Sequence, residues 1–68
     1  MITWNKFTDN GYMAKAEDKK VAIWLHGKSC ELTYERKNTK TAEWEVVVDR
    51  AIFRNYKVAK RYAEEKLS

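Results

Sequence analysis

The chain of 68 residues lacks proline and has one cysteine, one histidine and two glycines. The single cysteine excludes an internal disulfide and a multi-cysteine metal site, and it fits a reducing cytosol. Two isolated glycines exclude a glycine-rich phosphate loop. No apolar run approaches the roughly 20 residues of a membrane span, and the N-terminal residues show no basic leader. We therefore expect a cytoplasmic protein that neither spans a membrane nor carries a signal peptide.

Aromatic and aliphatic residues are plentiful enough for a folded chain. Hydrophobic residues make up 44% of it, including three Trp, four Tyr and two Phe. A chain this short buries only about 60% of the surface that its unfolded form exposes, so its core must be thin. Large aromatic side chains help because each one buries a large apolar area. We expect a single domain over residues 1–68, without an internal repeat or a linker.

The clearest local signal is a hairpin with strands at about 20–26 and 29–36. Gly27-Lys28 places glycine at the first central position of a two-residue loop, where a type II′ turn requires a positive φ. In this register Leu25 faces Cys30 and Ile23 faces Leu32, so the apolar side chains share one face. A slip by one residue would invert that face. The agreement between turn and alternation therefore predicts the pairing.

One further strand is expected on each side of this hairpin. A strand at about 12–17 joins through a turn at Asp18-Lys19, which places Met13 opposite Trp24. A last strand at about 41–49 follows a polar loop, and its alternation points four residues inward: Ala42, Trp44, Val46 and Val48. If Trp44 then meets Leu32, Glu31 lies opposite Glu45, and like charges in this position destabilise a sheet.

The C-terminal segment predicts a helix over about 55–67, with Asn55 as its N-cap. At about 100° per residue, one half of the helix is apolar. That half is formed by Tyr56, Val58, Ala59, Tyr62, Ala63 and Leu67. A stripe of this kind is typical of core packing, and small alanines let the helix approach a sheet closely. The predicted fold class is therefore α+β, with a four-stranded antiparallel sheet packed on one C-terminal helix.

No arrangement of residues predicts catalysis. His26 and Cys30 are the only candidates for a base and a nucleophile, but the hairpin register points Cys30 into the core and His26 outward. One histidine and one inward cysteine offer too few ligands for a metal site. Acid–base catalysis requires a pocket, but the carboxylates lie on an open sheet face where none is evident. We expect a non-enzyme with no catalytic residues, no metal and no cofactor.

The outer face of the predicted sheet is the first candidate binding surface. Trp24 is unusual there because a large aromatic on a polar face is typical of a contact site. The candidate protein-binding residues on this face are Met13, Trp24, Glu31, Glu43 and Glu45. In the alternative interpretation, the N-terminal segment covers Trp24, since Trp4 and Phe7 also need burial.

The helix supplies the second candidate surface. The net charge is +4, and the segment from Arg50 to Ser68 holds six basic and two acidic residues. The candidate nucleic-acid-binding residues on the polar half of the helix are Arg54, Lys57, Lys60 and Arg61. The alternative is a solvated helix face. A nucleic-acid module that used its sheet would need a basic, aromatic sheet, whereas this one is predicted to be acidic.

One family resemblance accompanies these patterns. Phe53, Ala59, Lys60, Ala63 and Glu64, in the spacing F-x5-A-K-x2-A-E, resemble the closing segment of many small phage and prophage proteins of ββββα type. The upstream WNKFTDNGYMAKA is similar to their opening strand. The closing helix is also similar to that of the arm-type DNA-binding domain of phage integrases, from which this chain departs by its acidic strands. The resemblance implies a phage-type accessory protein.

Together these observations predict a small inhibitor or adaptor that binds a bacterial host or defence protein. Trp24 and the surrounding carboxylates would form its contact face. The alternative is a nucleic-acid-binding accessory protein that uses the basic face of the helix. We expect a monomer or a weak homodimer.

Overall fold

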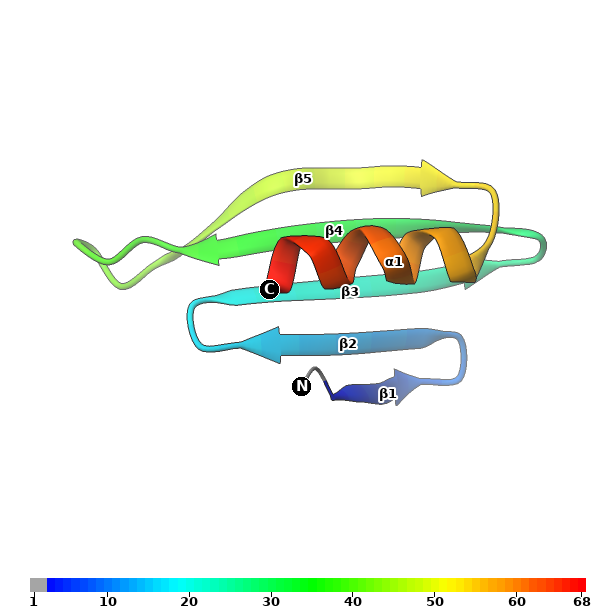
Figure 1. The fold of residues 1–68 in the computed structure, drawn as a ribbon, viewed down its shortest axis with the longest axis horizontal. Helices are drawn as coiled ribbons and strands as arrows, with labels where there is room; N and C mark the ends of the chain where they lie inside the picture. The colour runs from blue at the N-terminus through cyan, green and yellow to red at the C-terminus, as the bar shows by residue number, and fades with distance from the viewer. Residues whose placement is uncertain (1–2) are drawn as a thin grey trace.

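The computed structural model describes residues 3–68 as one antiparallel sheet followed by one helix (Figure 1). The elements are β1 (Trp4–Thr8), β2 (Gly11–Ala16), β3 (Lys19–His26), β4 (Ser29–Lys37), β5 (Trp44–Phe53) and α1 (Tyr56–Leu67). The strands are neighbours in chain order, so the sheet is a meander with β1 and β5 at its edges. The α+β class, the antiparallel sheet and the C-terminal helix are confirmed. The prediction of four strands is wrong, because the sheet has five.

The additional strand is β1, in a segment that the sequence left without an element. It pairs with β2 through Trp4↔Ala14 and Lys6↔Tyr12 before an irregularity near Thr8. The turn that follows is tied to β3 by Asn10. The Asn10 carbonyl accepts from the Leu25 N–H at 2.7 Å, and the Asn10 side chain donates to the Leu25 carbonyl at 3.2 Å. These bonds hold the β1–β2 hairpin beside the end of β3.

The two central pairings differ in how well the sequence predicted them. Leu25↔Cys30 and Ile23↔Leu32 are present, and Gly27 has a φ of 63° as the expected turn requires. The β2–β3 turn, however, lies at residues 17–18 and not at 18–19. It sets Ala16 opposite Lys19 and shifts the pairing by two residues from the predicted register. A shift of two keeps every side chain on its face, so alternation alone does not detect it.

Strand β5 begins and ends later than the predicted 41–49. Its register with β4 shifts twice, between Leu32 and Tyr34 and between Tyr34 and Glu35. Leu32 therefore pairs with Ala51, and the predicted pairing of Leu32 with Trp44 is wrong. Each β-bulge adds one residue to the bulged strand and changes which side chains point inward.

Three of the four residues expected to point inward from this strand are therefore reassigned. Val46 lies opposite Glu35 on the outer face, and Trp44 lies opposite Lys37. Ala42 is exposed in the loop before β5, with a φ of 61°. Only Val48, opposite Tyr34, packs against the core as predicted.

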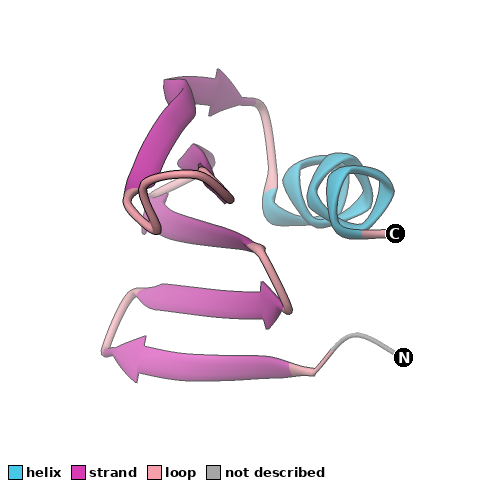
Figure 2. Cartoon of the chain, turned by 90° about the vertical axis from the view of Figure 1, so that its left-hand side faces the viewer, coloured by secondary structure: helices cyan, strands magenta, loops and turns pink. Residues whose placement is uncertain are grey.

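The core lies between α1 and the inner face of the sheet. Figure 2 shows the helix on only one side of the sheet. The buried side chains are Ala14, Val21, Ile23, Cys30, Leu32, Tyr34, Ala59, Ala63 and Leu67. Asn55 caps the helix as predicted, because its side chain accepts from the Val58 N–H at 2.9 Å. Ala59 and Ala63 are fully buried, so the helix axis approaches the sheet closely.

Two aromatic pairs connect α1 to strands on either side of it, β2 and β5. Tyr12 and Tyr56 have ring centroids 5.2 Å apart, and the rings of Phe53 and Tyr62 are separated by the same distance. Offset and tilted contacts at this separation are favourable for aromatic rings. Over residues 3–68, no helix combines the length and apolarity that crossing a membrane requires.

Candidate functional site

The face of the sheet opposite α1, here called the open face, carries a row of side chains that crosses four strands. Gly11 on β2 pairs with Trp24 on β3, which pairs with Glu31 on β4, which pairs with Ile52 on β5. Neighbouring strands lie about 4.8 Å apart, so this row extends roughly 14 Å across the sheet. We call it, together with the ring of Phe7, the aromatic row.

Phe7 belongs to this row because its ring lies over Gly11. The ring centroids of Phe7 and Trp24 are 5.7 Å apart at an interplanar angle of 87°, which is an edge-to-face contact. A Cβ at Gly11 would lie only 2.8 Å from Cζ of Phe7, so glycine leaves the space that the ring occupies. Trp24 is half-buried by this contact, whereas Phe7 remains 41% exposed and Ile52 65% exposed. The row is therefore a largely apolar strip, interrupted by Glu31 between Trp24 and Ile52.

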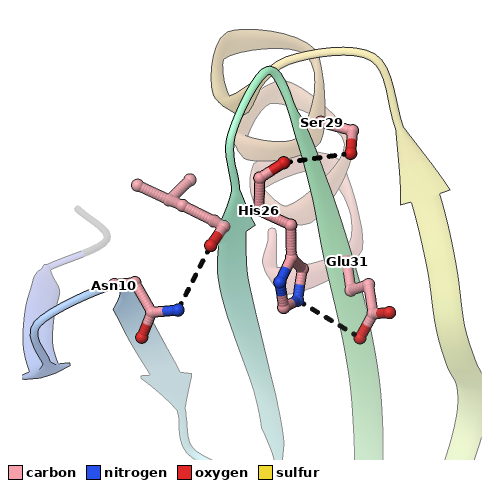
Figure 3. Close-up of polar contacts among 5 residues, drawn as sticks. Asn10, His26, Ser29 and Glu31 are labelled. Atoms are coloured by element: carbon pink, nitrogen blue, oxygen red, sulfur yellow. Dashed lines mark hydrogen bonds and ion pairs between the residues drawn. The ribbon is translucent and has the colours of Figure 1, made fainter.

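A shallow hollow of about 220 Å³ lies beside this strip. It is lined by Trp24, His26, Glu31, Thr33 and Arg50. His26 Nε2 lies 3.6 Å from Glu31 Oε2, and Figure 3 shows the two side chains pointing toward each other from β3 and β4. Beside the turn, Ser29 donates to the carbonyl of His26 at 3.3 Å. The hollow thus joins an indole ring, a carboxylate and a guanidinium within one surface.

The opposite end of the open face is different in character. Lys15, Lys20, Glu35 and Val46 form the corresponding cross-strand row. The ammonium groups of Lys15 and Lys20 lie 5.6 and 4.4 Å from the centroid of the Trp44 ring, and Lys20 also pairs with Glu35 at 3.6 Å. Cation–π contacts of this kind satisfy the ring within the chain itself. Trp44 is therefore covered by lysines, whereas Trp24 borders an open hollow.

The structure brings together only part of the predicted protein-binding set. Trp24 and Glu31 are direct cross-strand neighbours. Met13 lies on the same face but opposite Ala22, not opposite Trp24. The two remaining carboxylates lie elsewhere, since Glu43 precedes β5 and Glu45 pairs with Arg36.

The predicted like-charge contact between Glu31 and Glu45 is therefore wrong. Glu31 faces Ile52 instead, and the Asn38 side chain donates to Glu45 at 2.6 Å. Phe7, Arg50 and Ile52 were not predicted as site residues. The last two were missed because the sequence placed them in a connection, beyond the expected strand end at residue 49.

Of the four candidate nucleic-acid-binding residues, Lys57, Lys60 and Arg61 lie in α1, whereas Arg54 precedes its N-cap, Asn55. Arg54, Lys57 and Arg61 are exposed, and Lys60 is half-buried. Lys57, Lys60 and Arg61 line one hollow of about 280 Å³ together with Glu64. Glu64 is also the acceptor for the indole N–H of Trp4 at 3.5 Å, so a carboxylate is held within this basic surface.

A third hollow, of about 410 Å³, lies at the loop between β4 and β5. It is lined by Asp18, Arg36, Lys37, Asn38, Thr39, Lys40 and Glu45. Asn38 organises this loop, because its side-chain oxygen accepts from the backbone N–H groups of Lys40 and Thr41. The charges of this hollow are mixed, and it contains no aromatic side chain.

The remaining reactive side chains are placed apart. Cys30 is buried on the inner face, where burial raises the pKa of its thiol. His26 is exposed on the other face of the sheet, so the two do not meet. Within residues 3–68 there is also no group of three or more potential metal-ligating His, Cys, Asp or Glu side chains.

No protein-family model, curated protein or solved structure matches this chain.

Proposed function

We propose that this protein is a non-enzymatic protein-binding module that uses the aromatic row of its open face. The observation that carries the proposal is the pair formed by Phe7 and Trp24 beside the exposed Ile52, on the face that no helix covers. Exposed apolar patches rimmed by polar groups are typical of interaction sites. Tryptophan is also enriched among the residues that dominate binding energy at protein interfaces.

The dimensions of the molecule suit such a contact. Its principal extents are 39 × 24 × 21 Å, and the sheet lies in the broad face (Figure 1). A standard protein–protein interface buries about 800 Å² on each partner, which is comparable to the area of that face. The aromatic row supplies an apolar centre, and the charged side chains around it supply a polar rim.

The resemblance to small phage and prophage proteins supports the choice of partner. We propose an inhibitor or adaptor of a bacterial host or defence protein that acts as a monomer or a weak homodimer. Binding without chemistry is sufficient for either role. An indole at the centre of the contact would account for a large share of the binding energy.

Affinity capture from bacterial lysate, with nuclease treatment and mass spectrometry, tests this proposal. The wild type should retain a defined protein after nuclease treatment. Trp24→Ala should lose it, whereas the matched control Trp44→Ala should retain it because the Trp44 ring is covered by Lys15 and Lys20. Circular dichroism should show that both variants stay folded. If folded Trp24→Ala captures the same protein as the wild type, the proposal is wrong.

A nucleic-acid-binding role for the helix is the second candidate. The observation that favours it is the shared hollow lined by Lys57, Lys60 and Arg61. Binding that depends on phosphate contacts weakens steeply with salt, because bound counterions are released. The double variant Lys57→Ala/Arg61→Ala should then abolish binding to nucleic acid or flatten its salt dependence. Material that the wild type retains only without nuclease would favour this candidate over the first.

A further inference from the structure

Arg50 lies at a β-bulge that directs its side chain to the hollow beside Trp24. Leu32 pairs with Ala51 and Tyr34 pairs with Val48, so two residues of β5 lie opposite Thr33 alone. Arg50 has a φ of 55°. This left-handed backbone conformation costs conformational energy for every residue other than glycine. Bulges change the direction of a side chain, and strained backbone is concentrated at functional sites.

Within residues 3–68, the charge of Arg50 has no ion-pair partner. Among residues 3–68 the ion pairs are Lys20–Glu35 and His26–Glu31, so no carboxylate lies within 4.0 Å of the guanidinium. The carboxylate of Glu31 lines the same hollow but is directed to His26. A planar guanidinium that lacks an internal partner is well suited to receive an external carboxylate through two parallel hydrogen bonds.

The neighbouring groups define what else a ligand must present. The Trp24 ring forms one wall of the hollow, and Ile52 is exposed in the same cross-strand row. Ile52 lies two residues from Arg50 along β5, and Trp24 lies two strands away on β3, at about 4.8 Å per strand. The matching ligand therefore carries an acidic group beside a large apolar side chain.

We propose that Arg50 binds a carboxylate side chain of the partner protein while the aromatic row holds an adjacent apolar residue. This inference rests on the proposed protein-binding function and adds the chemistry of the segment that is recognised. A carboxylate complements the charge of the Arg50 guanidinium, and complementary charge accelerates association and selects the binding register. Glu31 in the hollow argues against a polyphosphate ligand, because its carboxylate would repel the phosphates.

Two backbone positions make a clean test possible. Arg50→Gly removes the guanidinium and places glycine where φ is already positive, so the variant should fold at least as well as the wild type. Ala42→Gly makes the same kind of backbone change in the loop before β5, outside the proposed site. It is therefore the matched control for a glycine at positive φ.

The experiment selects peptides from a random display library on the wild type and then measures their affinities by fluorescence anisotropy. Selected peptides should carry Asp or Glu beside a large apolar residue. Replacing that acid by its amide should weaken binding to the wild type and to Ala42→Gly by about ten-fold or more. The same replacement should change binding to Arg50→Gly by less than about two-fold, because the interaction has already been removed.

The results distinguish failure of this inference from failure of the proposed function. Peptides that require Trp24 but show no preference for an acid overturn the role of Arg50 and leave the binding face in place. An acid preference that persists in Arg50→Gly overturns it as well. Peptides that bind Trp24→Ala as well as they bind the wild type overturn the proposed function itself. If the wild type binds a single-stranded poly-dT oligonucleotide and Arg50→Gly does not, the ligand of Arg50 is a phosphate. This result would overturn the assignment of a carboxylate.

Discussion

The two faces of the sheet are built from alternate residues of the same strands, yet they differ in burial and in composition. In β3, Val21 and Ile23 are 0% exposed beneath the helix, whereas Trp24 lies on the open face beside a hollow. The buried residues of the described chain include no polar or charged residue. The open face instead combines aromatic, aliphatic and charged side chains. The inner face therefore supplies most of the stability, while apolar residues on the open face contribute little to folding.

The largest difference in unfolding free energy should appear when an isoleucine is replaced by alanine on each face in turn. Ile23→Ala removes a side chain with 0% exposure, and Ile52→Ala removes one with 65% exposure. Truncating a buried isoleucine costs about 2–5 kcal/mol because a cavity is left behind. A surface change should cost less than about 0.5 kcal/mol. Urea unfolding measures both values, and similar losses for the two variants would contradict the division between the faces.

A smaller effect, of opposite sign, is expected from glycine at the two residues with positive φ. Arg50→Gly and Ala42→Gly should each raise the free energy of unfolding by up to about 1 kcal/mol, because the left-handed conformation is unfavourable for both native residues. Urea unfolding of each variant gives the change. Destabilisation by Arg50→Gly alone would show that the arginine side chain supports the fold and is not reserved for a ligand.

The contact between the Phe7 ring and Trp24 is tested by Gly11→Ala. The added methyl group would lie 2.8 Å from Cζ of Phe7, so the ring must move away from its place over the strand. We expect a loss of about 0.5–1.5 kcal/mol, the range for one aromatic pair, because Phe7 is at an exposed edge and can move. The indole N–H signal of Trp24 in a ¹⁵N NMR spectrum should shift. An unchanged signal would mean that Phe7 does not shape this part of the open face.

The smallest effect concerns the inner face at high pH. Burial raises the pKa of the Cys30 thiol and of the Tyr56 hydroxyl, and nearby Tyr12, Glu64 and Cys30 raise the latter further. The folded protein then holds these protons at a pH where the unfolded chain has released them. The free energy of unfolding should therefore be fully retained below about pH 9 and fall as the pH rises beyond the ordinary values of 9.0 and 10.0. Urea unfolding at several pH values measures this fall, which should be reduced in Cys30→Ala/Tyr56→Phe.

Much of the inner face could be predicted from the sequence because turn chemistry and alternation agree there. Gly27 determines the β3–β4 turn, and Asn55 determines the start of the helix. The β2–β3 register was missed by two residues because its turn lacks glycine and either register keeps the same faces. The short strand β1 was missed because it is mostly exposed and only weakly patterned.

The candidate site was harder to predict because it depends on β5. A strict alternation from Trp44 onward places Trp44 and Val46 on the wrong face, since two bulges shift the register before Ala51. The sequence does not predict the positive φ of Arg50, because arginine is not typical of that conformation. A glycine or an asparagine at this position would have indicated it. Trp24 could be recognised from its own strand, whereas the residues that complete its surroundings come from β1 and β5.

Binding of the partner by the open face can be tested through the three tryptophans, because each one reports on a different region. Trp4 packs against the core and donates to Glu64 on the helix, Trp24 borders the open hollow, and Trp44 lies under two lysines. The captured partner would be titrated into ¹⁵N-labelled protein while the three indole N–H signals are followed. The Trp24 signal should shift or broaden most, and the Trp4 signal should change least. An unchanged Trp24 signal, with perturbed amides at Lys57 and Arg61, would contradict binding by the open face and assign it to the helix.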